Sequence, residues 1–127
     1  MPGEFVSFNE LTEMAREVHR VAKEKGWYDQ PETTHQFIMR SVANIHGEAS
    51  ELWEAERKGH CDADCDKAIK MREICVMPLT CLEEELADII IRTLDVAAHL
   101  GVNIGACVAS KHAYNQTREY RHGGKTA

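Results

Sequence analysis

The chain has 127 residues, a formal net charge of −6, 43% hydrophobic residues and 28% charged residues. This length and composition fit a single globular domain over residues 1–127 and exclude a disordered or fibrous chain. The acidic charge disfavours a binder of nucleic-acid polymers, which needs a basic surface, and no apolar run approaches the roughly 18 residues of a membrane span.

The first predicted helix follows a capping box formed by Ser7 and Glu10. Its apolar face has helical spacing and comprises Leu11, Met14, Ala15, Val18, Val21 and Ala22. Gly26 provides the stop, because glycine tolerates the left-handed conformation that ends many helices. The pattern therefore predicts an amphipathic helix between these two signals.

The longest predicted helix runs from about residue 34 to residue 58. Pro31 interrupts helical structure before it, and Gly59 ends it. Its apolar arc comprises Phe37, Ile38, Val42, Ile45, Ala49, Leu52 and Ala55. On a helical wheel Glu48 projects inside this arc, and Glu51 stands at its edge. An ionised glutamate in such a place needs a partner, a cation or a raised pKa.

Residues 60–79 are predicted to form a surface excursion, because the helical periodicity weakens there. One short helix is expected within it, from the apolar residues Ala68, Ile69, Met71 and Ile74. His60, Cys61 and Cys65 could begin a zinc site, but no second well-spaced ligand pair follows. Three alternating aspartates resemble a calcium loop that lacks its glycine and its closing glutamate. Incidental loop thiols are favoured over either metal.

The five cysteines of the chain are an odd number. The N-terminal sequence also lacks the basic stretch and the apolar run of a signal peptide. Both features favour reduced thiols over a disulfide framework, so we expect a cytoplasmic protein.

A second capping box, Thr80 with Glu83, predicts a helix that runs to Leu100 and is stopped by Gly101. This helix is apolar most of the way round, so it is expected to be central. Asn103 can cap a last helix. Four principal helices without a convincing strand predict an all-α fold, arranged as an antiparallel helical bundle.

The charged residues of the helix after Thr80 lie on one stripe, at spacings of three and four: Glu85, Asp88, Arg92, Asp95 and His99. One interpretation is a solvated face with ion pairs between Asp88 and Arg92 and between Asp95 and His99. The other is that Glu85 and Asp88 meet Glu48 and Glu51 of the preceding long helix. Four carboxylates together need a hard cation such as Mg²⁺, and the apolar surroundings of Glu48 favour this interpretation.

The last helix contributes cationic and amide side chains. Lys111, Asn115 and Arg118 share one stripe, which suits the oxygens of a polyphosphate beside a metal. An ordinary basic helix end is the alternative. A basic tail follows at about residues 120–127, where Arg121, His122 and Lys125 either bind a small anion or belong to a solvated terminus.

Three segments together resemble the MazG-type all-α nucleoside triphosphate pyrophosphatases. They are residues 46–52 with an ExxE motif, residues 84–92 with an ExxD motif, and the stripe of Lys111, Tyr114, Asn115 and Arg118. The resemblance implies a bundle completed by dimerisation, as a homodimer or a dimer of dimers. It also implies Mg²⁺, with Mn²⁺ as a substitute, held by Glu48, Glu51, Glu85 and Asp88. The stretch between the two motifs is longer than in compact members of the family.

The implied activity is hydrolysis of an NTP or dNTP to the monophosphate and pyrophosphate, in nucleotide-pool cleansing. Metal held by the carboxylates lowers the pKa of a bound water, which attacks the α-phosphorus. Glu51 is our candidate general base beside Glu48, although any of the glutamates could serve. Trp27, in a connector, is a better candidate than Trp53 for stacking a nucleobase, and core or interface packing is the alternative for both.

Two other function classes stay open. A ferritin-like di-iron protein also gathers carboxylates in a bundle, but it requires Glu-x-x-His motifs that the two acidic helices lack. A non-catalytic helical module that binds a partner protein would turn over no nucleotide, and its stability would be indifferent to Mg²⁺.

Overall fold

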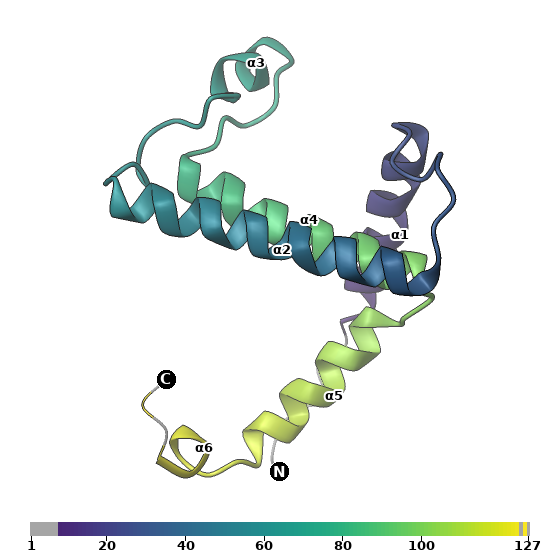
Figure 1. Cartoon of the computed structure of the whole chain (residues 1–127). Coiled ribbons are helices and arrows are strands. Elements are labelled where there is room, and N and C mark those ends of the chain that lie inside the picture. The colour runs from purple at the N-terminus through teal and green to yellow at the C-terminus, as the bar shows by residue number, and fades with distance from the viewer. Residues whose placement is uncertain (1–7, 125, 127) are drawn as a thin grey trace.

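The computed structural model describes residues 8–124 and 126, and this part of the chain is built from helices without a named strand (Figure 1). The helices are α1 (Asn9–Glu24), α2 (Thr34–Arg57), α3 (Ala68–Glu73), α4 (Cys81–His99), α5 (Ile104–Gln116) and α6 (Arg121–Gly124). The all-α class is therefore confirmed. The short α6 within the expected basic tail is not predicted from the sequence.

Local signals define most helix ends. The predicted capping box of Thr80 and Glu83 is present at the start of α4, and the Asn103 side chain accepts a hydrogen bond from the Ala106 N–H at the start of α5. A capping box of Thr33 and Gln36 opens α2 without having been predicted. The expected box at Ser7 involves a residue outside the described part of the chain, and α1 begins at Asn9.

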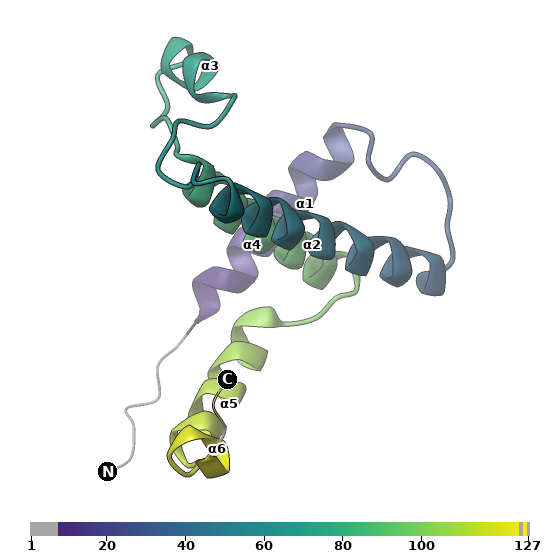
Figure 2. The same cartoon turned by 60° about the vertical axis from the view of Figure 1, so that its left-hand side comes forward.

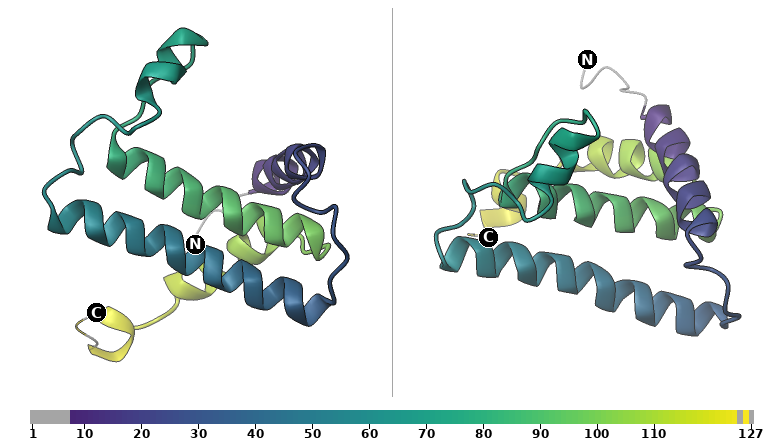
Figure 3. Two further views of the ribbon diagram at one scale, coloured as in Figure 1. Left: turned by 45° about the horizontal axis from the view of Figure 1, so that its top comes forward. Right: turned by 90° about the horizontal axis from the view of Figure 1, so that it is seen from above.

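Helix α4 is central, as predicted. It runs antiparallel beside α2, and α1 crosses it on one face (Figures 1 and 3). The core between these helices is small and includes Ala15, Phe37, Leu94 and Ala97.

Helix α5 contacts α1 and the end of α4 and then extends away from the α2–α4 pair (Figure 2). Its entry depends on Gly105, because an added Cβ there would clash with the backbone carbonyl of Phe8. The Gly105 N–H also donates to the Thr12 hydroxyl at 3.0 Å. Three helices of the chain therefore pack together, while the fourth helix of the expected bundle diverges from them.

Large apolar side chains are exposed on the α2–α4 pair. Ile38 and Val42 of α2 and Leu86 and Ile90 of α4 are all at least 40% exposed. The chain has an accessible surface of 9655 Å², whereas a compact monomer of 14.4 kDa exposes about 6,800 Å². The single chain therefore leaves apolar surface without cover.

Residues 60–79 form the expected excursion, and α3 is its one short helix, at a distance from the α2–α4 pair (Figure 3). Backbone hydrogen bonds close its base, from the Cys65 N–H to the Leu79 carbonyl at 2.9 Å and from the Cys81 N–H to the Ala63 carbonyl at 2.8 Å. The base of the excursion is thereby fixed to the start of α4.

None of the described helices alone has the length and apolarity to cross a bilayer, and α4 with α5 meets that test only as a pair bent by 114°.

Candidate metal centre

Three carboxylates meet where α2 and α4 lie side by side. Glu48 comes from α2, and Glu85 and Asp88 come from one turn of α4. One ligand oxygen from each lies within 4.8 Å of the others. Glu48 is only 8% exposed, so the wheel placed this residue correctly inside the apolar arc. The ExxE and ExxD motifs are thus brought together in space.

Burial and the neighbouring carboxylates raise the pKa values of Glu85 and Asp88. The pKa of Glu85 rises to about 8, first because burial disfavours its charged form and then because the carboxylates of Glu51 and Glu48 are close. The pKa of Asp88 is also raised, by burial first and next by Glu48. Glu51 itself is exposed beside the cluster. All four predicted ligands are therefore near enough to interact.

One oxygen of Glu85 is a particularly suitable ligand for a cation. Its Oε2 atom is buried and has no hydrogen-bond partner among the described residues. A buried polar atom without a partner costs free energy, and carboxylate oxygens are the donors that Mg²⁺ prefers. The donor set of the cluster therefore fits a hard divalent cation.

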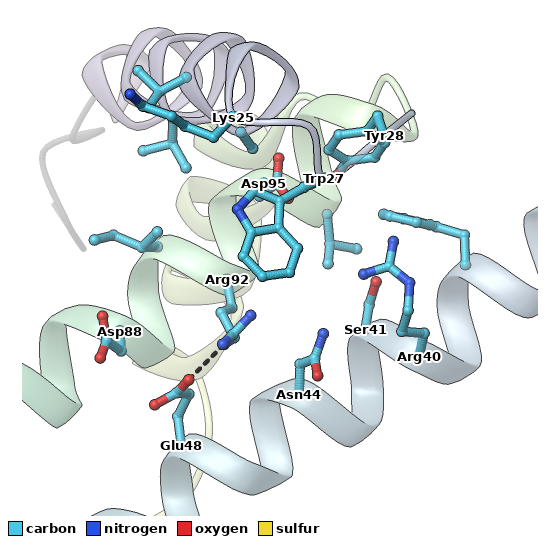
Figure 4. Close-up of a pocket in the computed structure, with 16 residues that line it drawn as sticks. Lys25, Trp27, Tyr28, Arg40, Ser41, Asn44, Glu48, Asp88, Arg92 and Asp95 are labelled. Atoms are coloured by element: carbon cyan, nitrogen blue, oxygen red, sulfur yellow. Dashed lines mark hydrogen bonds and ion pairs between the residues drawn. The ribbon is translucent and has the colours of Figure 1, made fainter. Parts of the chain in front are cut away.

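Arg92 belongs to this site, although its partner differs from the one that the sequence suggested. Its Nε donates to Glu48 Oε1 at 2.6 Å (Figure 4). The expected pair of Arg92 with Asp88 on the same helix is not formed among the described ion pairs. The guanidinium supplies one positive charge to the carboxylate cluster, and the described residues form no ion pair with Glu85 or Asp88.

A cavity of about 310 Å³ opens beside the carboxylates, between α1, α2 and α4. Glu48 and Asp88 lie at one end of its wall, with Arg92 and Asn44 next to them (Figure 4). Trp27 stands over the cavity and is 66% exposed. The remaining lining is mostly apolar and aromatic and includes Val18, Val21, Tyr28, Phe37, Ile91 and Val96.

The other tryptophan is not part of this cavity. Trp53 lies on α2 and is 66% exposed, with the guanidinium of Arg57 above its ring at 5.8 Å. Of the two aromatic candidates for a base, only Trp27 lines the cavity that also contains Glu48 and Asp88.

A polar and aromatic network supports the far end of the cavity, and the sequence did not reveal it. Asp95 Oδ1 lies 2.8 Å from His19 Nδ1, and Asp95 Oδ2 accepts a hydrogen bond from the Tyr28 hydroxyl at 2.7 Å. His99 stacks on Tyr28, with ring centroids 4.6 Å apart, instead of pairing with Asp95. Burial lowers the pKa of His99, and the nearby His19 lowers it further. The network therefore fixes the connector that carries Trp27.

The predicted phosphate-binding stripe on α5 lies apart from the cluster. Lys111 Nζ is 4.9 Å from the ring centre of Tyr114, and the guanidinium of Arg118 lies 5.7 Å from the same ring. Asn115 is exposed on the same helix. Because α5 diverges from the α2–α4 pair, one chain does not bring Lys111, Asn115 or Arg118 to its own carboxylates (Figure 1).

The basic tail is described only in part. The guanidinium of Arg121 lies 5.5 Å from the ring centre of Tyr120. The side chain of His122 and the whole of Lys125 lie outside the described residues.

Comparison with known proteins finds no matching family model, no matching curated protein and no matching solved structure. The geometry of the site and the motif resemblance are therefore the two grounds for a function.

Proposed function

We propose that the protein is a Mg²⁺-dependent pyrophosphohydrolase that converts an NTP or dNTP to the monophosphate and pyrophosphate. The observation that carries the proposal is the buried, unpartnered Oε2 of Glu85 in a cluster with Glu48 and Asp88. Such an oxygen is stabilised by either a proton or a cation. The adjoining cavity makes a nucleotide a suitable ligand, because it offers an aromatic plate and apolar walls beside the cation site.

The nucleoside part of the substrate occupies the cavity of about 310 Å³ in this proposal. Trp27 stacks on the base, a contact worth roughly 1–3 kcal/mol in comparable sites. The polar side chains of Ser41 and Asn44 line the same cavity and are available for hydrogen bonds. The triphosphate then extends from the cavity toward Glu48 and Asp88 at its edge.

Glu48, Glu51, Glu85 and Asp88 would hold the cation. Bound Mg²⁺ would balance the phosphate charge and lower the pKa of a water molecule. Glu51 is the best-placed general base, because it is the exposed member of the group and can accept the proton of the attacking water. Arg92 holds Glu48 in place through the 2.6 Å contact.

The active assembly in this proposal is a homodimer or a dimer of dimers. The exposed apolar stripes of α2 and α4 provide a contact surface, and the accessible surface of the chain exceeds that of a compact monomer. Pairing of these stripes would complete the helical bundle. It would also allow α5 of one chain to carry Lys111, Asn115 and Arg118 toward the phosphates bound by another, which its own chain geometry disfavours.

Pyrophosphate release from a panel of canonical and modified NTPs and dNTPs tests the activity. We expect turnover in Mg²⁺, weaker or altered turnover in Mn²⁺, and none in a chelator. Glu48→Gln and Asp88→Asn should each reduce kcat by about a hundredfold or more, because even indirect supports of metal ligands cost 10- to 100-fold. Glu13→Gln on the exposed side of α1 serves as the matched control.

Two outcomes would overturn this function. Folded Glu48→Gln and Asp88→Asn proteins that keep the parental rate would exclude the carboxylate mechanism. A parent that hydrolyses no nucleotide and whose stability ignores Mg²⁺ would favour the partner-binding module, and iron bound after purification would favour the di-iron class.

A further inference from the structure

Lys67 is the cation that the excursion brings to α4. It precedes α3, and its Nζ contacts the carboxylate of Glu84 and lies 3.2 Å from Asp66 Oδ1. Glu84 is buried, whereas the Lys67 side chain is 61% exposed. The ammonium therefore has a buried partner in Glu84 and an exposed partner in Asp66, and it remains accessible to solvent.

The position of Glu84 places this ammonium beside the candidate metal centre. Glu84 and Asp88 are four residues apart on α4, so they lie on the same helix face and about 6 Å apart along the axis. The excursion thus supplies a positive charge at the edge of the carboxylate cluster.

The order of side chains along α4 sets the orientation in which a nucleotide would bind. Asp95, Arg92 and Asp88 follow one another along the cavity wall, and Asp88 also belongs to the carboxylate cluster. Lys67 and Glu84 lie on the other side of the cluster, toward the start of α4. A nucleotide with its base in the cavity and its α-phosphate at the carboxylates would direct its β- and γ-phosphates toward Lys67.

We propose that Lys67 binds the β- and γ-phosphates of the substrate and holds the pyrophosphate as it leaves. This role rests on the proposed hydrolase function. Water adds to the α-phosphorus, and the bond from that phosphorus to the bridging oxygen breaks. The bond electrons pass to pyrophosphate, and the proton of the water passes to a carboxylate. Lys67 stabilises the charge that develops on the leaving group, as ammonium groups do for phosphates.

The same residues could be taken for a second metal site, since ligand atoms of Cys65, Asp66 and Glu84 lie within 4.8 Å of one another. The ammonium of Lys67 already contacts the Glu84 carboxylate and contributes a positive charge there. A second cation would meet repulsion at this place. An anion bound above Lys67 meets attraction instead.

Binding of Mg²⁺ and of pyrophosphate to the full-length protein tests this role by calorimetry. Lys67→Met should weaken pyrophosphate binding in saturating Mg²⁺ by about tenfold or more, and Lys67→Arg should recover most of the loss. The affinity of Lys67→Met for Mg²⁺ alone should equal or exceed that of the parent, because the substitution removes a positive charge near the cation. Lys70→Met, in the same excursion and exposed, is the matched control and should bind both ligands as the parent does.

A purely structural lysine would behave differently. If Lys67 only anchors the excursion, Glu84→Gln should impair pyrophosphate binding as much as Lys67→Met does, and this result would overturn the proposal. In a phosphate-binding role Glu84→Gln should leave pyrophosphate binding unchanged or tighter, because it removes a competing negative charge.

The remaining outcomes separate this proposal from the hydrolase function. Parental pyrophosphate affinity in Lys67→Met, with Mg²⁺ binding and nucleotide hydrolysis intact, would refute the role of Lys67 alone. A parent protein that binds Mg²⁺ and hydrolyses nucleotides but does not bind pyrophosphate would also refute it. A parent without Mg²⁺ binding or hydrolysis would refute both proposals.

Discussion

Binding of Mg²⁺ should displace a proton from the carboxylate cluster. Burial and the neighbouring carboxylates raise the pKa of Glu85 to about 8, so the group is largely protonated in the metal-free protein at pH 7. A carboxylate that binds a cation must give up this proton. Metal affinity and proton release are therefore linked through a single residue.

The size of this linkage follows from the pKa. With a pKa of about 8, Glu85 carries about 0.9 proton at pH 7 and about 0.1 proton at pH 9. Competition with the proton weakens binding by a factor of about 100 at pH 6 and about 2 at pH 8. The affinity for Mg²⁺ should thus rise roughly 50-fold between pH 6 and pH 8.

Calorimetric titration with Mg²⁺ in two buffers of different ionisation enthalpy measures the released protons directly. Glu85→Gln should bind Mg²⁺ more weakly and lose most of the pH dependence, while Glu13→Gln on α1 should behave as the parent. Proton release near zero at pH 7, together with an affinity that does not change from pH 6 to pH 8, would show that Glu85 is not a protonated ligand.

Three further outcomes are expected. Without Mg²⁺ the free energy of unfolding should fall as the pH rises from about 4.5 to 8, because the folded state holds a proton on Glu85 that the unfolded state has lost. Denaturant unfolding at several pH values measures this dependence, and saturating Mg²⁺ should abolish it. Gly105→Ala should destabilise the fold by about 1–3 kcal/mol in urea unfolding, because its methyl group would meet the Phe8 carbonyl. Analytical ultracentrifugation should show the proposed homodimer for the parent and for Glu13→Gln, and a monomer for Ile90→Glu, because this substitution places a charge on the exposed apolar stripe.

Most helix ends could be predicted because their causes lie within a few residues. The hydroxyl of Thr80 and the carboxylate of Glu83 cap the same turn, and Asn103 caps the next helix. Gly59 and Gly101 both adopt positive φ, near +70°, where the preceding helices end. The burial of Glu48 could also be predicted, since helical periodicity alone places it among apolar residues.

The partners of the charged residues were less predictable, because they depend on how the helices pack. Asp95 has His99 one turn away on its own helix, yet it contacts His19 of α1, a residue 76 positions away. Arg92 reaches across to Glu48 in the same manner. Spacing along one helix identifies the neighbours of a side chain on that helix, but it carries no information about the helix that crosses it.

Apolar periodicity also overstated the burial available within one chain. The arc of α2 was expected to face a core, but Ile38 and Val42 remain exposed because no described helix covers that side. A wheel shows which face of a helix is apolar and not whether the covering surface comes from the same chain. For the same reason, the sequence predicted a closed bundle that includes α5, whereas α5 diverges from α2 and α4.

The charge balance of the carboxylate cluster links the binding of Mg²⁺ to the binding of the nucleotide in the proposed function. Glu48, Glu51, Glu85 and Asp88 would carry four negative charges if all were ionised, and Arg92 offsets one of them. Burial and the neighbouring carboxylates raise the pKa of Glu85 to about 8, so a proton on this residue reduces the remaining repulsion in the metal-free protein at pH 7. A divalent cation would replace that proton, and its charge would in turn attract phosphate oxygens. In the proposed hydrolase the acidic cluster would therefore bind a polyanion only after the cation has bound, so Mg²⁺ and nucleotide should bind with positive cooperativity.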